Sequence, residues 1–323
     1  MKYLLGLFII FNVNAEVPNL ILVHIGKTLP DYLASCIKQI RVFNPPGQLN
    51  LFLIGNKTAF SVEHKNICSQ FNIEVVYKED LVQSNEHKIF IQNYKSRGLW
   101  LYSIERFFLI QELMSSRSLK NIFHIECDNM LYCNLFEMMP IFEDNYKGLG
   151  VIFDSNLRAI LSFMYIKNQE AINALAKTFA DNSNANITDM STPRILADNY
   201  GESIIDNLPL VPHLYLENSL KNNLGEVAIH PESFSKNFEK FNSIFDAAAI
   251  GQYLGGIDPI HSNSKPGFIN ETAFINPSKL QYEWHVDEMN RKVPYAIYQG
   301  VKFRINNLHI HCKNLEKFRS YIL

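Results

Sequence analysis

The sequence has few cysteines and almost no charge excess, and each of these shortages excludes a class of protein. Its five cysteines, in a chain of 323 residues, are odd in number and widely spaced. They therefore form neither a disulfide framework nor a zinc pattern of the CxxC kind. The formal net charge is only −2, which argues against a basic nucleic-acid-binding surface and against an acidic disordered tail. We expect no nucleic-acid partner, and any anionic ligand must be held by a local group of charges.

Long apolar runs are also scarce. The one near the N-terminus covers residues 3–13 and follows Lys2. Its last residue begins Val13-Asn14-Ala15, which is a small-residue cleavage site. It is shorter than the roughly 20 residues of a spanning helix, so we expect no stable transmembrane segment. The pattern predicts a cleaved signal peptide over residues 1–15, and thus a protein of the secretory pathway lumen or an exported one. The alternative is a buried first strand or helix, which would make the protein cytoplasmic.

Apolar runs and helical periodicities alternate along the first half of the chain, and a hydrophobic fraction of 47% suffices for an extended core. The patterns predict strands over 20–26, 49–55, 73–77, from 122 onward, 147–153 and 159–166, and helices over 32–42, 62–71, 99–115 and 169–180. This order indicates an α/β fold with a mostly parallel sheet flanked by helices. Ligands bind such sheets beyond the carboxyl ends of the strands, where His24 and Gly26 would lie.

The second half of the chain has a different pattern. From residue 181 onward, short segments rich in Asn, Pro and Gly follow one another, and the prolines prevent long helices. No linker, repeat or charge block separates this half from the first. We therefore expect a single domain over residues 16–323, with a loop-rich half over 181–323.

The most informative segment is 122–130, in which an apolar strand runs into Glu126 and Asp128. Residues i and i+2 of a strand project from the same face, so we expect the two carboxylates to converge on one cation. Mg²⁺ and Mn²⁺ take oxygen ligands and often combine one or two carboxylates with the phosphates of a substrate. The alternative is that both acids simply end the strand and cap the following turn.

Residues 101–135 resemble the central signature of GT-A fold glycosyltransferases, of the glycogenin and bacterial lipopolysaccharide galactosyltransferase type. In that family a helix with an Arg precedes a strand that ends in an acidic-x-acidic metal motif. Arg106, Glu126 and Asp128 occupy these positions here. The family usually has Asp at the first acidic position, so Glu126 is a departure from its pattern.

Two further segments extend this resemblance. Residues 307–313 are similar to the family segment in which a His completes the metal site and a Lys reaches the diphosphate. His309 and His311 would share a strand face, so either could be the ligand, and we favour His311 because it lies closest to Lys313. Two solvated histidines on a surface strand are the alternative. Asp189 falls where the family has an acidic residue beside the transferred sugar.

The resemblance implies a hexosyltransferase that uses Mn²⁺ or Mg²⁺ and a nucleotide-diphosphate sugar. The acceptor would be a hydroxyl of a glycan, a lipid or a protein. The diphosphate gains negative charge as it leaves, and a divalent ion with Lys313 and Arg106 would stabilise that charge. His24 and Gly26 would line the donor site in a nucleotide-sugar-binding half over residues 16–180, and residues 181–323 would form the acceptor side.

Residues 245–259 have no counterpart in the short members of that family. One interpretation is that Asp246 and Gln252 face the cleft from the acceptor side, as an acid–base or sugar-binding pair. The other is a structural helix and turn, since the small residues of this segment permit close backbone packing.

Two other functions compete with sugar transfer. A nucleotidyltransferase would share the sheet and the metal–diphosphate chemistry, but it should carry a Gly-rich basic loop after the first strand, and residues 26–30 are too short for one. A secreted, non-catalytic carbohydrate-binding protein with a glycosyltransferase-like fold is the third hypothesis. Glu126 and the signal-like N-terminus are compatible with it, so it stays open.

Overall fold

The computed structural model describes residues 16–216, 219–260 and 264–321, so the predicted signal peptide lies outside the described residues. At its centre is a seven-stranded sheet with the order β3-β2-β1-β4-β7-β6-β8. In that order the strands are Ile73–Tyr77, Asn50–Gly55, Asn19–His24, Ile122–Ile125, Ala159–Ile166, Leu149–Phe153 and Ile205–Asn207. Only β7 runs against its neighbours in this sheet. The predicted α/β fold with a mostly parallel sheet is confirmed.

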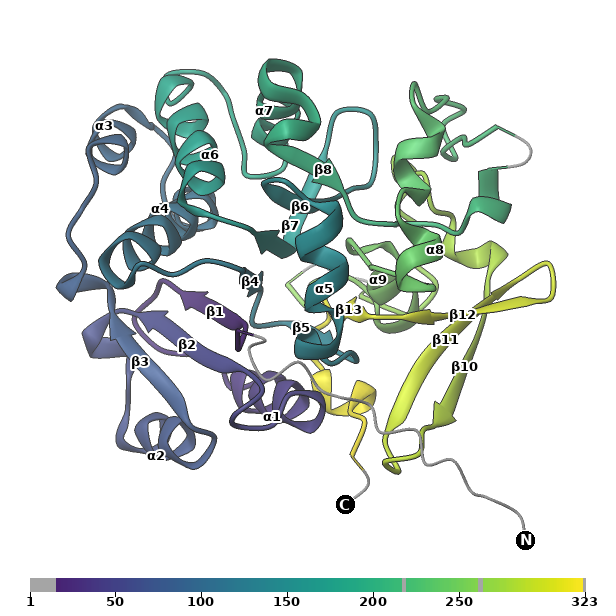
Figure 1. Cartoon of the computed structure of the whole chain (residues 1–323), viewed down its shortest axis with the longest axis horizontal. Coiled ribbons are helices and arrows are strands. Elements are labelled where there is room, and N and C mark those ends of the chain that lie inside the picture. Colours follow the sequence, from purple (N-terminus) through teal and green to yellow (C-terminus); the bar gives the residue numbers. More distant parts are fainter. Residues whose placement is uncertain (1–15, 217–218, 261–263, 322–323) are drawn as a thin grey trace, which may run out of the picture.

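Helices cover both faces of this sheet. In Figure 1, α1 (Leu33–Phe43) and α2 (Val62–Gln70) lie below β1–β3, and α4 (Leu99–Arg117) and α6 (Gln169–Asp181) lie above them. The central strands are apolar on both sides because neither face meets water, and Leu20 and Phe123 are completely buried.

Five more helices complete the described part of the chain. They are α3 (Asn85–Asn93), α5 (Leu135–Asn145), α7 (Thr192–Tyr200), α8 (Phe238–Phe241) and α9 (Ala249–Gly255). Pro193, one of the prolines that we expected to prevent long helices, lies in the first turn of the nine-residue α7, where its missing N–H breaks no helical hydrogen bond. Among the described residues, none of the helices combines the length and the apolar character that crossing a membrane requires.

The second half also contains a sheet that the prediction of a loop-rich half missed. Its order is β10-β11-β12-β9, with β10 (Gln281–Val286), β11 (Lys292–Tyr298), β12 (Val301–Ile305) and β9 (Ser243–Ile244). Gln299 and Gly300 join β11 to β12 with φ values of 48° and 80°, as in a two-residue type I′ turn. Pro294 fits into β11 because β12 pairs only with the residues from Tyr295 onward. The prolines thus exclude long helices here without excluding strands.

A two-stranded ladder joins the two halves of the chain. Strand β13 (Asn307–His309) pairs antiparallel with β5 (Asn129–Leu131), and His309 stands opposite Asn129. The backbone N–H of Ile310 continues the contact by donating to the carbonyl of Asp128 at 2.9 Å. This pairing brings residues 307–313 next to the acidic motif.

Candidate active site

The Glu126-Cys127-Asp128 motif lies in the turn between β4 and β5. Strand β4 ends at Ile125, and the N–H of Asn129 closes the turn by donating to the carbonyl of Glu126 at 3.0 Å. The reason we gave for convergence, a shared strand face, is therefore wrong. The turn nevertheless gathers the two carboxylates: ligand atoms of Glu126, Asp128 and His309 all lie within 4.8 Å of one another.

His309 completes this cluster from β13. Its Nε2 is 2.9 Å from Glu126 Oε2 and 3.3 Å from Asp128 Oδ1. Its Nδ1 is 2.9 Å from the carbonyl oxygen of Ala247, and since a carbonyl can only accept, Nδ1 carries a proton. Nε2 is thus the nitrogen that faces the carboxylates, where it can offer either a proton or a lone pair.

The charges of the cluster depend on one another. Burial by itself would raise the pKa of Asp128, but His309 and Lys313 hold that pKa well below its usual range. Glu126 behaves in the same way beside Arg106 and His309. Burial would lower the pKa of His309, but the two carboxylates outweigh it and raise this pKa to about 10. At neutral pH the ring is protonated, and a divalent cation between the same atoms would displace that proton.

Two fixed positive charges flank the cluster. The Nζ of Lys313 contacts Asp128 Oδ2, and the Nη1 of Arg106 contacts Glu126 Oε1. The Nη2 of Arg106 donates to Asp189 Oδ2 at 2.8 Å, which links this third acid to the site. Burial raises the pKa of Asp189 even though the Arg106 charge opposes that rise. A side chain as long as Glu at position 126 reaches Arg106 on one side and His309 on the other.

His311 lies beside His309 but outside the carboxylate cluster. The two ring centroids are 4.3 Å apart, and His311 Nδ1 is 3.2 Å from Gln252 Nε2. Burial and the charge of His309 lower the pKa of His311 to about 3, so its ring is neutral. The geometry therefore places His309, and not His311 as we preferred, against the two carboxylates. Within the described part of the chain, His311 Nε2 and Gln252 Oε1 have no hydrogen-bond partner.

Asp246 is completely buried and does not face a cleft, so the structure favours the second of our two interpretations for it, a structural helix and turn. Its carboxylate accepts hydrogen bonds from the backbone N–H groups of Ile250, Gly251 and His309 at 3.0, 2.9 and 3.1 Å. Burial raises its pKa to about 6, although these donors oppose the rise. A Cβ at Gly251 would lie 2.0 Å from the carbonyl oxygen of His309, so this close approach requires glycine. Asp246 holds α9 against the strand that carries His309.

Two buried asparagines, which the sequence did not single out, tie the motif to β13. Asn307 Nδ2 donates to Asn129 Oδ1 at 3.0 Å and to the carbonyl of Asp246 at 2.9 Å. Asn129 Nδ2 donates to the carbonyl of Ser162 on β7 at 3.0 Å. Asparagine is so frequent in this chain that the residue type alone did not mark these two positions as functional. What could have marked them is their place in the sequence, because each lies beside or within a predicted motif.

His24 is the last residue of β1, which lies next to β4 in the sheet, and Gly26 lies in the loop that follows β1. His24 Nε2 is 2.8 Å from the carbonyl oxygen of Thr28, and the N–H of Gly26 donates to Asn56 Oδ1 at 3.0 Å. Burial lowers the pKa of His24, against the opposing effect of the Thr28 carbonyl. A Cβ on Gly26 would lie 2.9 Å from His24 Nε2, so the loop is tightly closed. Both residues thus lie at the predicted edge of the sheet.

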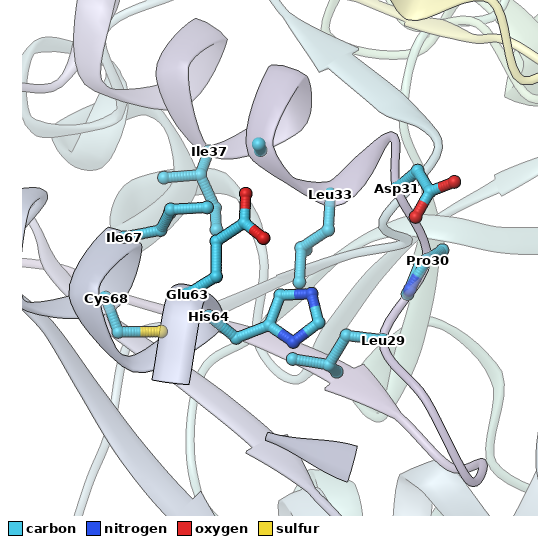
Figure 2. Close-up of a pocket in the computed structure, with 10 residues that line it drawn as sticks. Leu29, Pro30, Asp31, Leu33, Ile37, Glu63, His64, Ile67 and Cys68 are labelled. Carbon is cyan, nitrogen blue, oxygen red and sulfur yellow. The ribbon is translucent and has the colours of Figure 1, made fainter. Parts of the chain in front are cut away.

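A cavity of about 270 Å³ lies between this loop and helices α1 and α2. Leucine and isoleucine side chains form much of its wall, and Figure 2 shows the His64 ring pointing into it. The backbone N–H of Ser61 donates to His64 Nδ1 at 3.3 Å, so this nitrogen caps the start of α2. The wall also includes Asp31 and Glu63, but none of the residues of the charged cluster, so this cavity is separate from that cluster.

No family model and no curated protein matches the chain, but solved structures do. Mouse xyloside xylosyltransferase 1 in its apo form has a TM-score of 0.44 and 12% identity, over 62% of this chain and 89% of that one. The galactosyltransferase LgtC in complex with donor and acceptor sugar analogs has a TM-score of 0.42 and 10% identity, over 59% and 73%. Core-mannan synthase A from Aspergillus fumigatus, in an Mn/GDP form, has a TM-score of 0.40 and 10% identity, over 61% and 74%. The structure is thus similar to solved glycosyltransferases, but distantly, so function has to be argued from the residues of the site.

Proposed function

We propose that this protein is a metal-dependent hexosyltransferase, which moves a sugar from a nucleotide-diphosphate sugar to a hydroxyl group of an acceptor. The observation that carries the proposal is the cluster of Glu126, Asp128 and His309, with Lys313 and Arg106 on its flanks. Cation ligands and fixed positive charges at one sheet edge suit a substrate whose leaving group is a diphosphate.

The chemistry of the donor set fits Mn²⁺ or Mg²⁺. It consists of two carboxylates and one imidazole, without a thiolate, and carboxylate-rich sites suit these hard cations. The hydrogen bond from His309 Nδ1 to Ala247 leaves Nε2 as the ligating atom. Glu126, Asp128 and His309 would hold the ion, and diphosphate oxygens would complete its coordination. When bound, the ion supplies positive charge to the leaving diphosphate.

Lys313 supplies a second positive charge for the same diphosphate. Burial would lower the pKa of Lys313, but Asp128 and Glu126 outweigh it and raise this pKa, so the ammonium stays protonated at neutral pH. A fixed charge that is already in place when the glycosidic bond breaks lowers the barrier without a cost of reorganisation. Arg106 holds Glu126 and Asp189 in position from the other side.

Gln252 and His311 are suited to hold a hydroxyl of the transferred sugar. If Gln252 Nε2 donates to His311 Nδ1, the free atoms are an acceptor, Gln252 Oε1, and a donor, His311 Nε2–H. If the amide is turned over, the same two positions become a donor and an acceptor. Either way the pair offers one of each, which is what a hydroxyl group needs. We assign Asp189 to the same sugar, and His24 and Gly26 to the nucleotide side.

The test measures binding of UDP and GDP by isothermal titration, with and without Mn²⁺, followed by Mn²⁺-dependent hydrolysis of a panel of nucleotide sugars. We expect Mn²⁺-linked nucleotide binding in the natural chain and its loss in Asp128→Asn. Asp181→Asn, in an exposed ion pair with Lys177, is the matched control. Nucleotide binding that is the same with and without Mn²⁺, and the same in Asp128→Asn, would contradict the proposal. Sugar binding without nucleotide would favour a non-catalytic carbohydrate-binding protein.

We propose in addition that residues 1–15 direct the protein into the secretory pathway lumen or out of the cell. The support is the short apolar run and the small-residue cleavage site that follows it. N-terminal sequencing of the protein made in its own cells should begin after Ala15. A mature chain that begins at Met1 would contradict this proposal.

A further inference from the structure

A cavity of about 940 Å³ lies along the edge strand β8. It is separate from the group of Glu126, Asp128 and His309 that we propose as the metal site and call the metal cluster. Helix α7, residues 155–157 and part of the segment 229–237 contribute to its wall, and Figure 1 shows α7 beside β6 and β8. Since β6 and β8 run parallel to β4, all three strands end at the edge of the sheet where the metal cluster lies. Residues 155–157 follow β6, so the cavity reaches this edge. Three strand spacings, about 14 Å, separate β8 from β4.

The charged groups of the wall exclude a phosphorylated ligand. They are Arg194, Asp198, Glu202, Asp206, Glu232 and Lys236, which amount to four carboxylates and two cations. Lys236 Nζ is 2.8 Å from Glu202 and 2.7 Å from Asp206. Arg194 Nε donates to Asp198 at 2.9 Å. Because acidic partners already neutralise both cations, a phosphate or nucleotide would meet an excess of negative charge.

The rest of the wall combines amide groups with apolar side chains. Asn207 is 4% exposed, and its Oδ1 accepts from the N–H of Phe153 at 2.9 Å, while its Nδ2 has no partner in the described part of the chain. Leu157 and Ile229 are 69% and 70% exposed at this cavity. A sugar ring has the matching chemistry, because its hydroxyls pair with amides and carboxylates and its C–H faces pack on aliphatic side chains.

We propose that this cavity binds a neutral oligosaccharide stretch of the acceptor. The inference rests on the proposed function, since the acceptor hydroxyl then reacts at the metal cluster. Because about 14 Å of sheet lies between the two places, a chain of several sugars spans them and a single sugar does not. The acceptor is accordingly a glycan of several residues, which narrows the choice among glycan, lipid and protein.

The test is binding of neutral hexasaccharides of glucose, mannose, galactose or N-acetylglucosamine to the full chain, by isothermal titration without metal or nucleotide. We expect at least one of them to bind. Leu157→Arg and Ile229→Arg should each weaken binding about tenfold, because the guanidinium displaces the ring from its aliphatic support. Val286→Arg, at a position 56% exposed on β10, is the matched control and should bind as the natural chain does. The inference is overturned if no hexasaccharide binds, or if the control weakens binding as much as the cavity variants.

A second measurement separates this inference from the proposed function. In both cavity variants we expect Mn²⁺-dependent binding of UDP or GDP as in the natural chain. The KM for the hexasaccharide acceptor should rise about tenfold while kcat stays unchanged. Nucleotide binding without hexasaccharide binding overturns the cavity's role alone. Hexasaccharide binding without nucleotide binding overturns the transferase, and the acceptor role with it.

Discussion

Arg106 and Lys236 each bridge two carboxylates, but in opposite surroundings. Arg106 lies at the metal cluster with 10% of its side chain exposed, and it joins two acids. Lys236 lies in the wall of the large cavity with 30% of its side chain exposed, and it also joins two acids. Charge alone does not distinguish the two arrangements, whereas burial does, because charges taken out of water depend entirely on their partners.

This contrast separates the two candidate sites as well. At the metal cluster, hydrogen bonds to Asp246 and to the carbonyl of Ala247 fix His309, and the amide pair of Asn307 and Asn129 ties its strand to the acidic motif. In the cavity, the side chains of Lys236 and Glu202 are 30% and 73% exposed to water, and only Asp206 among the acids that Lys236 contacts is buried. We therefore expect substitutions at the cluster to act on stability and chemistry together, and substitutions in the cavity to act on binding with only a small loss of stability.

The largest effect should come from Arg106→Met. It leaves the carboxylates of Glu126 and Asp189 without their shared partner, so the free energy of unfolding should fall by about 3–5 kcal/mol. Lys236→Met removes a bridge whose ammonium and Glu202 carboxylate are exposed to water while Asp206 is buried, and should cost less, about 1 kcal/mol. Urea unfolding of both variants checks the pair. If both variants lost the same free energy of unfolding, burial would not distinguish the two bridges.

The next largest effect should come from Lys313→Ala, and it concerns the catalytic rate. Loss of a fixed charge at the leaving diphosphate should lower kcat about 100- to 1,000-fold, with a smaller change in the KM for the nucleotide sugar. Lys313→Arg should recover part of the rate, and Lys317→Ala, a neighbouring lysine, should have little effect. If Lys313→Ala changed KM alone, Lys313 would bind the substrate without stabilising the leaving group.

Asp246→Asn should have a moderate effect, on stability. An amide NH₂ would replace one acceptor oxygen against backbone N–H donors, so we expect a loss of about 1–3 kcal/mol in the free energy of unfolding. The pH profile of kcat should keep its shape, because Asp246 positions His309 without touching the reacting atoms. A lost rate at unchanged stability would instead restore Asp246 to the catalytic role that the sequence suggested.

The last prediction concerns pH. The pKa of His309 is raised from 6.5 to about 10 in the metal-free protein, so its contribution to stability is complete below pH 6.5 and is lost as the pH rises towards 10. Metal binding must displace this proton, so the apparent affinity for Mn²⁺ should rise about tenfold per pH unit between pH 6.5 and 8.5. Titrations with Mn²⁺ measure the slope, and His309→Ala should flatten it. A flat dependence in the natural chain would argue against His309 as a ligand.

The central sheet could be predicted because its signals are local. Strands β1, β2, β3 and β7 are short apolar runs, and the buried stripe of α6 recurs at helical spacing within one segment. The acidic motif could be predicted as a pair, but its geometry could not. Whether Glu126 lies on a strand or in a turn depends on where β5 begins, and that is decided by its pairing with β13.

The choice between the two histidines could not be made from the sequence either. The two histidines differ in their partners. The Nδ1–H of His309 donates to the carbonyl of Ala247, whereas the Nδ1 of His311 contacts Gln252. Both partners come from a segment about 60 residues upstream, whose position depends on the buried carboxylate of Asp246. The sheet of β10, β11 and β12 was missed for another reason: proline was taken as evidence for loops, although Pro294 stands where no second strand pairs.

The ladder between β5 and β13 has a kinetic consequence. The amides of Asn129 and Asn307 meet across 178 positions of the chain, and closing so long a loop is entropically costly before any contact rewards it. Contacts between distant positions form slowly compared with helices and neighbouring strands. In refolding from denaturant, far-UV circular dichroism should therefore recover before affinity for Mn²⁺ returns. Binding of Mn²⁺ would then measure the last step of folding, and a partly folded chain would bind no cation.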